Sequence, residues 1–211
     1  MSTLILSADH PQAIEEAVSV LKRGGLVAFP TDTVYGVGAP AFDPQAVTRL
    51  YEVKERPRSK AIPLLLADGA DLPSVAEPIP PLAERLAERF WPGPLTLVLP
   101  RRAVVPDVVT AGGDTVAVRV PDHPVARALI AAAGMPLATT SANRSGEPSP
   151  VTAEEVMAQL GGRIDLILDG GRCPGGVPST VLDLTVSPPA VLRPGPVSDR
   201  DIERMIASGR N

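Results

Sequence analysis

The residues best suited to chemistry are hydroxyls, amides and cations that follow short apolar runs. They are Thr33, Arg56, Lys60, Arg119, Ser141, Asn143, Ser149, Ser179 and Arg193. Side chains of these types recognise phosphates, carboxylates and ribose through hydrogen bonds and charge, and they are not nucleophiles. The sequence therefore indicates a binding site for an anionic ligand such as a nucleotide.

The stretch from Pro30 to Gly38 is the one around which the chain is organised. It follows the apolar run 26–29 and contains hydroxyls, one carboxylate, a phenol and two glycines. Proline removes a backbone donor and glycine permits close backbone approach, so the stretch predicts a shaped loop at a strand end. Ligands bind at strand ends in open α/β sheets, although an ordinary strand-to-loop transition is an equally good interpretation of this stretch alone.

A second feature is a run of alternating cations, Lys54, Arg56, Arg58 and Lys60. Pro57 disfavours helical geometry at the residue before it, and alternate side chains of an extended chain share a face. We expect these four cations to lie on one face, where a polyphosphate would relieve their repulsion. The alternative is a solvated surface stretch, which is the usual fate of a charge run.

Several other functions are excluded or disfavoured. The net charge of -4 argues against a protein that coats nucleic acid, and the single cysteine, Cys173, excludes an internal disulfide. Two histidines and one cysteine form no zinc-type cluster, and the chain has neither a G-x-x-x-x-G-K-[ST] nor a G-x-S-x-G motif. No apolar run reaches the ~18 residues of a membrane span and no leader is evident, so we expect a cytoplasmic protein with no membrane contact.

Secondary-structure signals alternate along the chain. Apolar runs predict strands, and Asp9, Asp43, Asp122, Thr152 and Ser198 are predicted helix caps. This pattern indicates one α/β domain over residues 1–211, with a twisted mixed parallel and antiparallel sheet and flanking helices. The expected strands are 26–29, 61–67, 95–99, 115–120, 136–140, 164–168, 179–183 and 191–195.

A set of motifs in one order resembles the YrdC-type threonylcarbamoyl-AMP synthases. The motifs are PTDTVYGVG, K-x-R-P from Lys54, FWPGPLTLVL, VRVPDHPVA, TSANRSG, STVLDL and RPGPVS. This resemblance covers nearly the whole chain. It implies a YrdC-like fold and an enzyme that condenses L-threonine, bicarbonate and ATP into threonylcarbamoyl-AMP and pyrophosphate, for modification of the adenosine beside the anticodon in tRNA.

The resemblance also implies roles for individual residues. The L-threonine contacts are Thr33, Arg119, Thr139 and Ser179. The ATP contacts are Arg56, Lys60, Thr115, Ser141, Asn143, Ser149 and Arg193. Lys54 and Arg56 are the expected catalytic cations, which would neutralise the triphosphate and the departing pyrophosphate. We expect Mg²⁺ to be held mainly by ATP phosphates, and the product to pass to the machinery that transfers the threonylcarbamoyl group to tRNA.

The chain departs from the family pattern in two ways, and three other functions are possible alternatives. Leu65 stands where many relatives carry histidine, and the chain resembles the short, single-domain form of the family. The rivals are an RNA-binding module, a carbamoyl-transfer domain of a larger enzyme and a homologue without turnover. An aromatic content of 3% offers few platforms for base stacking, so we expect at most weak RNA contact.

Overall fold

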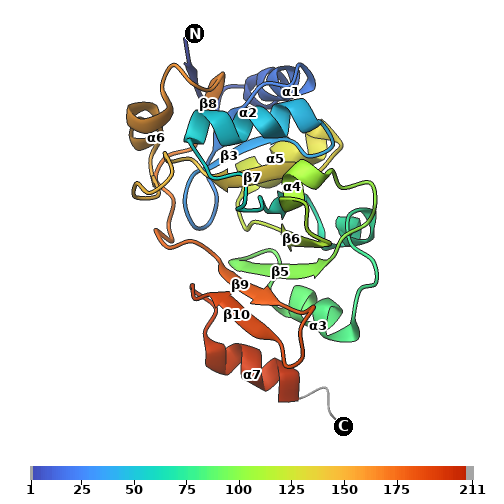
Figure 1. The fold of residues 1–211 in the computed structure, drawn as a ribbon. Coiled ribbons are helices and arrows are strands. Elements are labelled where there is room, and N and C mark those ends of the chain that lie inside the picture. Colours follow the sequence, from blue (N-terminus) through green and yellow to red (C-terminus); the bar gives the residue numbers. More distant parts are fainter. Residues whose placement is uncertain (1, 208–211) are drawn as a thin grey trace.

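The computed structural model describes residues 2–207 and contains one ten-stranded sheet (Figure 1). The strand order is β1-β8-β2-β3-β7-β4-β6-β5-β9-β10, and both parallel pairs, such as β5 with β9, and antiparallel pairs, such as β5 with β6, occur. The predicted mixed α/β sheet is therefore confirmed. The strands are β1 (Leu4–Ser7), β2 (Val27–Phe29), β3 (Gly36–Pro40), β4 (Leu64–Leu65), β5 (Leu95–Pro100), β6 (Thr115–Arg119), β7 (Leu137–Ser141), β8 (Leu166–Asp169), β9 (Thr180–Asp183) and β10 (Ala190–Arg193).

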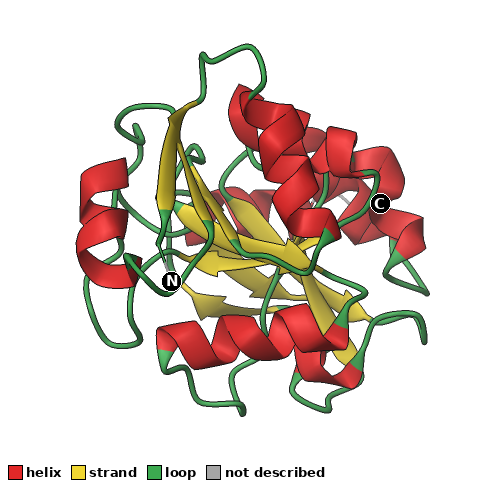
Figure 2. Ribbon diagram, turned by 90° about the horizontal axis from the view of Figure 1, so that it is seen from above, coloured by secondary structure: helices red, strands yellow, loops and turns green. Residues whose placement is uncertain are grey.

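Helices lie on both sides of the sheet (Figure 2). They are α1 (Ala13–Lys22), α2 (Pro44–Lys54), the 3-10 helix η1 (Gly69–Ser74), α3 (Pro81–Phe90), α4 (Asp107–Thr110), α5 (Pro124–Ala133), α6 (Ala153–Leu160) and α7 (Asp199–Ala207). Within residues 2–207, none of them is long and apolar enough to cross a bilayer.

Three of the five predicted caps are confirmed. Asp43 accepts the N–H groups of Gln45 and Ala46, and Thr152 and Ser198 each accept an N–H three residues later. The prediction for Asp9 is wrong, because helix α1 begins at Ala13 behind Gln12 and has no side-chain cap. The prediction for Asp122 is wrong, because helix α5 begins one residue later behind His123 and has no side-chain cap.

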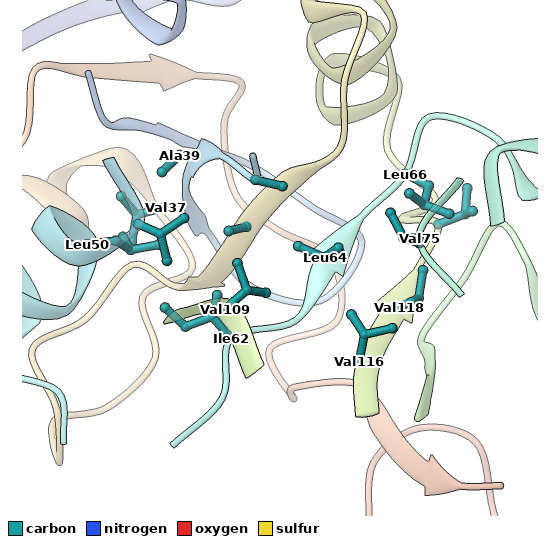
Figure 3. Close-up of a cluster of buried hydrophobic side chains, with 14 of the residues drawn as sticks. Val37, Ala39, Leu50, Ile62, Leu64, Leu66, Val75, Val109, Val116 and Val118 are labelled. Atoms are coloured by element: carbon teal, nitrogen blue, oxygen red, sulfur yellow. The ribbon is translucent and has the colours of Figure 1, made fainter. Parts of the chain in front are cut away.

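One face of the sheet is covered along its length. Alternation along β6 sends Val116 and Val118 to this face, where they join a buried cluster that includes Leu64 and Val37 (Figure 3). Helices α2, α3, α4, α6 and α7 all contribute buried side chains to the same cluster. This face is the main hydrophobic core of the protein.

The opposite face is covered only in part. Helices α1 and α5 pack over the alternate side chains of β2, β7 and β8, including Val27, Phe29 and Leu137. Farther along the same face, Thr96 of β5 and Ala117 of β6 line a cavity instead of packing beneath a helix. The fold thus leaves one half of this face open, and the candidate site lies there.

The expected loop from Pro30 to Gly38 is wrong in its second half. Gly36–Pro40 forms strand β3, which pairs with β2 and β7 in the sheet. A Cβ on Gly38 would lie 3.0 Å from the Phe29 ring and from Thr139 Oγ1, so glycine lets neighbouring side chains cross the strand. The glycines therefore serve packing within the sheet, and only residues 30–35 remain as connection.

Two other boundaries differ from expectation. The apolar run 61–67 contains a strand of only two residues, Leu64–Leu65, because only these residues pair with β6 and β7. The segment 101–114, between the expected strands 95–99 and 115–120, contains the short helix α4, which contributes Val109 to the main core. Neither difference alters the strand order that positions the site.

Candidate active site

The open half of the sheet face forms a cavity of about 420 Å³. Its floor comes from strands β5, β6, β7, β9 and β10, and its walls come from the segments that precede β3 and β4. Its polar lining residues are Thr31, Thr33, Tyr35, Arg56, Thr96, Thr115, Arg119, Thr139, Thr140, Ser141, Ser179 and Arg193.

Arg119 is the most deeply placed cation of this cavity. It ends strand β6 and is only 6% exposed. Its Nε donates to the carbonyl of Gly93 at 2.9 Å, Nη1 donates to Thr33 Oγ1 at 3.0 Å, and Nη2 forms an ion pair with Asp32. Burial lowers the pKa of Arg119, and the Asp32 carboxylate opposes that shift. Three contacts therefore fix the plane of the guanidinium.

The hydroxyls around Arg119 are also held in place. Thr31 and Thr33 share a hydrogen bond of 2.9 Å between their Oγ1 atoms, and Thr31 Oγ1 donates to the carbonyl of Val34 at 2.7 Å. Thr96 Oγ1 and Ser179 Oγ form a second pair and lie 2.8 Å apart. The cavity thus presents two ordered pairs of hydroxyls in addition to Arg119.

Two further arginines line the cavity without a carboxylate partner in the described part of the chain. Arg193 donates from Nε and Nη2 to the carbonyl of Ser179 at 3.0 and 2.7 Å, and Arg56 donates to the carbonyls of Lys60 and Ala61. Burial lowers the pKa of Arg193, and the nearby Arg119 and Arg56 lower it further. A site in which cations disfavour one another is suited to an anion with several charges.

The expected cation face from Lys54 to Lys60 is wrong. Helix α2 continues to Lys54 and ends where Glu55 adopts a left-handed conformation, so the segment is not extended. Lys54 is 1% exposed and points into the protein, Arg58 lies near Glu52, and Lys60 is exposed. Of the four cations, Arg56 alone lines the cavity.

Lys54 instead anchors the loop that follows β7. Its ammonium donates to the carbonyls of Ser141 and Asn143, and its own carbonyl accepts the N–H of Ser145. Next to it, Glu55 forms ion pairs with Arg144 and Arg163. Burial, and then the nearby Arg56, lower the pKa of Lys54 to about 7.

Asn143 turns the same loop. Its Nδ2 donates to the carbonyls of Arg144 and Glu147, each at 2.8 Å, while its buried Oδ1 has no partner in the described structure. Asn143 therefore helps to shape the segment that presents Ser141 to the cavity.

Most, but not all, of the expected site residues come together. The cavity lining contains Thr33, Arg56, Thr115, Arg119, Thr139, Ser141, Ser179 and Arg193. Lys54, Lys60, Asn143 and Ser149 lie outside that lining. Leu65 does line it, at the border with the apolar cluster under α1 and α5.

Sequence reasoning missed several members of the site. Thr96 is the one polar residue in the apolar run 95–99, and that irregularity could have marked it. Tyr35 is buried, and its hydroxyl donates to the carbonyl of Gly171 at 2.8 Å, which ties the 169–171 turn to the cavity wall. Nothing in the sequence indicates the ion pair of Asp32 with Arg119, so the structure alone gives Asp32 a role.

The described residues hold no group of three or more His, Cys, Asp or Glu side chains arranged to bind a metal ion. A second cavity of similar size lies between η1, α3 and α5, lined by Trp91, Glu84 and Glu88 among others. Its acidic rim is opposite in character to the arginine-lined cavity. The latter is therefore the candidate active site for an anionic substrate.

Comparison with known proteins agrees with this site. A family model for Sua5, YciO and YrdC proteins, described as "Telomere recombination", matches residues 19–195. The chain belongs to this family. A threonylcarbamoyl-AMP synthase from Pyrococcus abyssi is 50% identical over 93% of this chain, and one from Bacillus subtilis is 47% identical over 95%. The chain spans 58% of the length of each of these two relatives.

A solved structure extends the similarity to the fold. The structure of Pyrococcus abyssi Sua5 complexed with L-threonine superposes with a TM-score of 0.94 and 48% sequence identity. The match covers 97% of this chain and 61% of the Sua5 chain. The single YrdC-like sheet expected from the motifs is thus shared with a protein of known structure.

Proposed function

We propose that this chain makes threonylcarbamoyl-AMP and pyrophosphate from L-threonine, bicarbonate and ATP, as a nucleotidyltransferase. The observation that carries the proposal is the pairing, in one cavity, of a charge-compensated arginine with two uncompensated ones. An amino acid needs a carboxylate site with little net charge, whereas a triphosphate needs several cations. The names of the relatives and the L-threonine bound to Pyrococcus Sua5 support the same substrates.

L-Threonine would bind beside Arg119. The guanidinium would hold the carboxylate, and Thr33, Thr139 and Ser179 supply hydroxyls for the polar atoms of the amino acid. All four side chains line the cavity and are buried, so their positions are fixed before any ligand arrives. This preorganisation lowers the ordering cost of binding.

ATP would occupy the more cationic part of the cavity. Arg56 and Arg193 would bind phosphate oxygens, with Thr115 and Ser141 as hydroxyl contacts. Lys60 and Ser149 lie outside the lining, so a role for them requires a nucleotide that extends past it. Lys54 and Asn143 would act through the 141–149 loop that they hold.

The proposed reaction needs no protein nucleophile. The threonine amine attacks the carbon of bicarbonate and water leaves, which gives a carbamate. A carbamate oxygen then attacks the α-phosphorus of ATP, and the bond from that phosphorus to the pyrophosphate oxygen breaks. The chain would contribute orientation, worth roughly 7–11 kcal/mol in favourable cases, together with charge on the departing pyrophosphate.

Mg²⁺ is proposed as the cofactor, held by ATP phosphates and water. The residues present fit this arrangement, because the polar lining consists of hydroxyls and arginines and includes no carboxylate that would serve as a direct ligand. When bound, the ion would offset charge on the triphosphate. Arg56 and Arg193 would orient the same phosphate groups from the protein side.

The proposed product is a reactive intermediate for the modification of tRNA. A mixed anhydride between a carbamate and AMP is an activated acyl group, which suits transfer to the amine of an adenosine in tRNA. We propose that the chain hands this product to the tRNA-modifying machinery, with at most weak RNA contact of its own. The three cavity arginines would also serve an RNA-binding module, and that rival is an outcome of the test below.

The deciding experiment is pyrophosphate release from ATP and Mg²⁺, with threonine and bicarbonate omitted in turn. The proposal predicts release only when both are present, and a product that contains both the threonine carbon skeleton and AMP. Release that ignores either omission would overturn the synthase function. RNA binding without any release would instead favour the binding module.

A further inference from the structure

Asp32 joins three parts of the site through one carboxylate oxygen. Its Oδ1 forms the ion pair with Arg119 Nη2 and also accepts the N–H of Asp122 at 3.0 Å. The Asp32 side chain is only 13% exposed, so water screens this pair weakly. Asp32 thereby ties the segment before β3 to the end of β6 and to the start of α5.

The contacts of Arg119 leave part of its guanidinium free. A guanidinium has five N–H groups, and three of them are used by Gly93, Thr33 and Asp32. Among the described residues, no other hydrogen bond involves this side chain, so one N–H remains on each of Nη1 and Nη2. These N–H groups are available to donate to the oxygens of a carboxylate.

The charge around Arg119 differs from that at the other cavity arginines. Arg119 is the one lining cation that has a carboxylate partner in the described structure, whereas Arg56 and Arg193 donate only to carbonyl and hydroxyl oxygens. Burial lowers the pKa of the nearby His123, so the imidazole adds no charge at neutral pH. The net charge at the Arg119 and Asp32 pair is therefore close to zero.

We infer that Asp32 is a positioning and selectivity residue, which fixes the guanidinium of Arg119 and makes it select a zwitterionic amino acid over a bare anion. This inference rests on the proposed function, because it takes L-threonine as the ligand of Arg119. A zwitterion brings both charges and gains nothing from a net positive site. A simple carboxylate is favoured by positive charge, and Asp32 removes that advantage.

The test compares two ligands on two variants. L-Threonine and (R)-3-hydroxybutanoate share the carboxylate and the β-hydroxyl, but only threonine has the amine. Asp32→Asn keeps an oxygen that can accept from Arg119 and Asp122 while removing the charge. We expect the preference for threonine over hydroxybutanoate, measured by calorimetry at neutral pH, to fall by about tenfold or more.

Asp32→Ala removes both the charge and the acceptor. We expect it to bind threonine about tenfold more weakly than Asp32→Asn does, because the buried guanidinium loses its anchor. Asp122→Asn is the matched control, since it removes a neighbouring charge whose side chain is exposed and, among the described residues, makes no hydrogen bond or ion pair with Arg119. The control should keep the wild-type preference, and ATP affinity should stay within about twofold in all variants.

The possible results distinguish failure of the proposed function from failure of the role of Asp32. Failure of the wild-type chain to bind threonine would overturn the proposed function, and this inference with it. If the wild type binds threonine but Asp32→Asn keeps the wild-type preference, or weakens both ligands in parallel, the selectivity role is wrong. Equal threonine affinity in Asp32→Asn and Asp32→Ala would overturn the positioning role.

Discussion

The two halves of one sheet face differ in what covers them. Under α1 and α5, this face is apolar and buried, with Val27 and Phe29 of β2, Leu137 of β7, and Leu166 and Leu168 of β8. On β5, β6 and β9, where no described helix packs, the same face carries Thr96, Arg119 and other polar groups around a cavity. A strand buried on both faces must be apolar on both, whereas an open face is free to hold polar groups for a ligand. The missing cover therefore makes the site possible.

We expect the largest effect from the same valine-to-alanine substitution made in each half, measured as the loss in the free energy of unfolding. Val27 is fully buried under the helices, and Val98 is 9% exposed and lines the cavity. We expect Val27→Ala to lower the free energy of unfolding by about 2–3 kcal/mol, because it removes two buried methyl groups and leaves a void. Val98→Ala should cost clearly less, and urea unfolding of both variants measures the difference. Equal losses would contradict the division of the face.

Strand β3, which pairs with β2 and β7, offers a second test. Gly36 pairs with Ser141, and a Cβ at this position would lie 2.8 Å from Thr139 Cγ2. We expect Gly36→Ala to destabilise the protein by about 1–3 kcal/mol and to displace Thr139, a proposed threonine contact. Thermal unfolding and threonine titration check the two effects. Gly134→Ala, at the end of α5 and away from the cavity, should lower stability through its positive φ without changing threonine affinity.

Much of this division is visible in the sequence. Alternation along Thr115 to Val120 predicts a strand with Arg119 on one face, and the resemblance to the family predicts eight of the polar residues that line the cavity. Strand β3 was missed because two glycines and a proline within five residues have low strand propensity, and pairing with β2 and β7 overrides that preference. Such pairing is non-local, so sequence pattern alone does not indicate it.

The cation segment shows a second limit of pattern reasoning. Spacing alone predicts that Lys54 and Arg56 share a face. In the structure, helix α2 extends to Lys54 and Glu55 turns the chain, so the two side chains diverge. The carbonyls that Lys54 binds come from residues almost ninety positions later in the sequence. A partner so distant in sequence cannot be found from local periodicity.

The buried Lys54 predicts a pH effect with a definite sign. Its pKa in the folded protein is about 7 because of burial, below its unfolded value, so the folded state binds fewer protons between those two values. The free energy of unfolding should therefore rise with pH from about 7 upward, by at most about 1.4 kcal/mol per pH unit from this group. Chemical denaturation of the wild type and Lys54→Met at several pH values gives the slope of each. Parallel curves would show that Lys54 does not titrate in this range.

The measurement that tests the central claim most directly is the binding of L-threonine and ATP to Arg119→Gln and Arg56→Gln. The account predicts a crossed pattern: Arg119→Gln weakens threonine binding by about 1.5–3 kcal/mol with a much smaller effect on ATP, and Arg56→Gln does the reverse. Each ligand is titrated alone by calorimetry, with circular dichroism as the control for folding. Equal losses for both ligands in either folded variant would contradict the assignment of separate threonine and ATP sites within the open half of the sheet face.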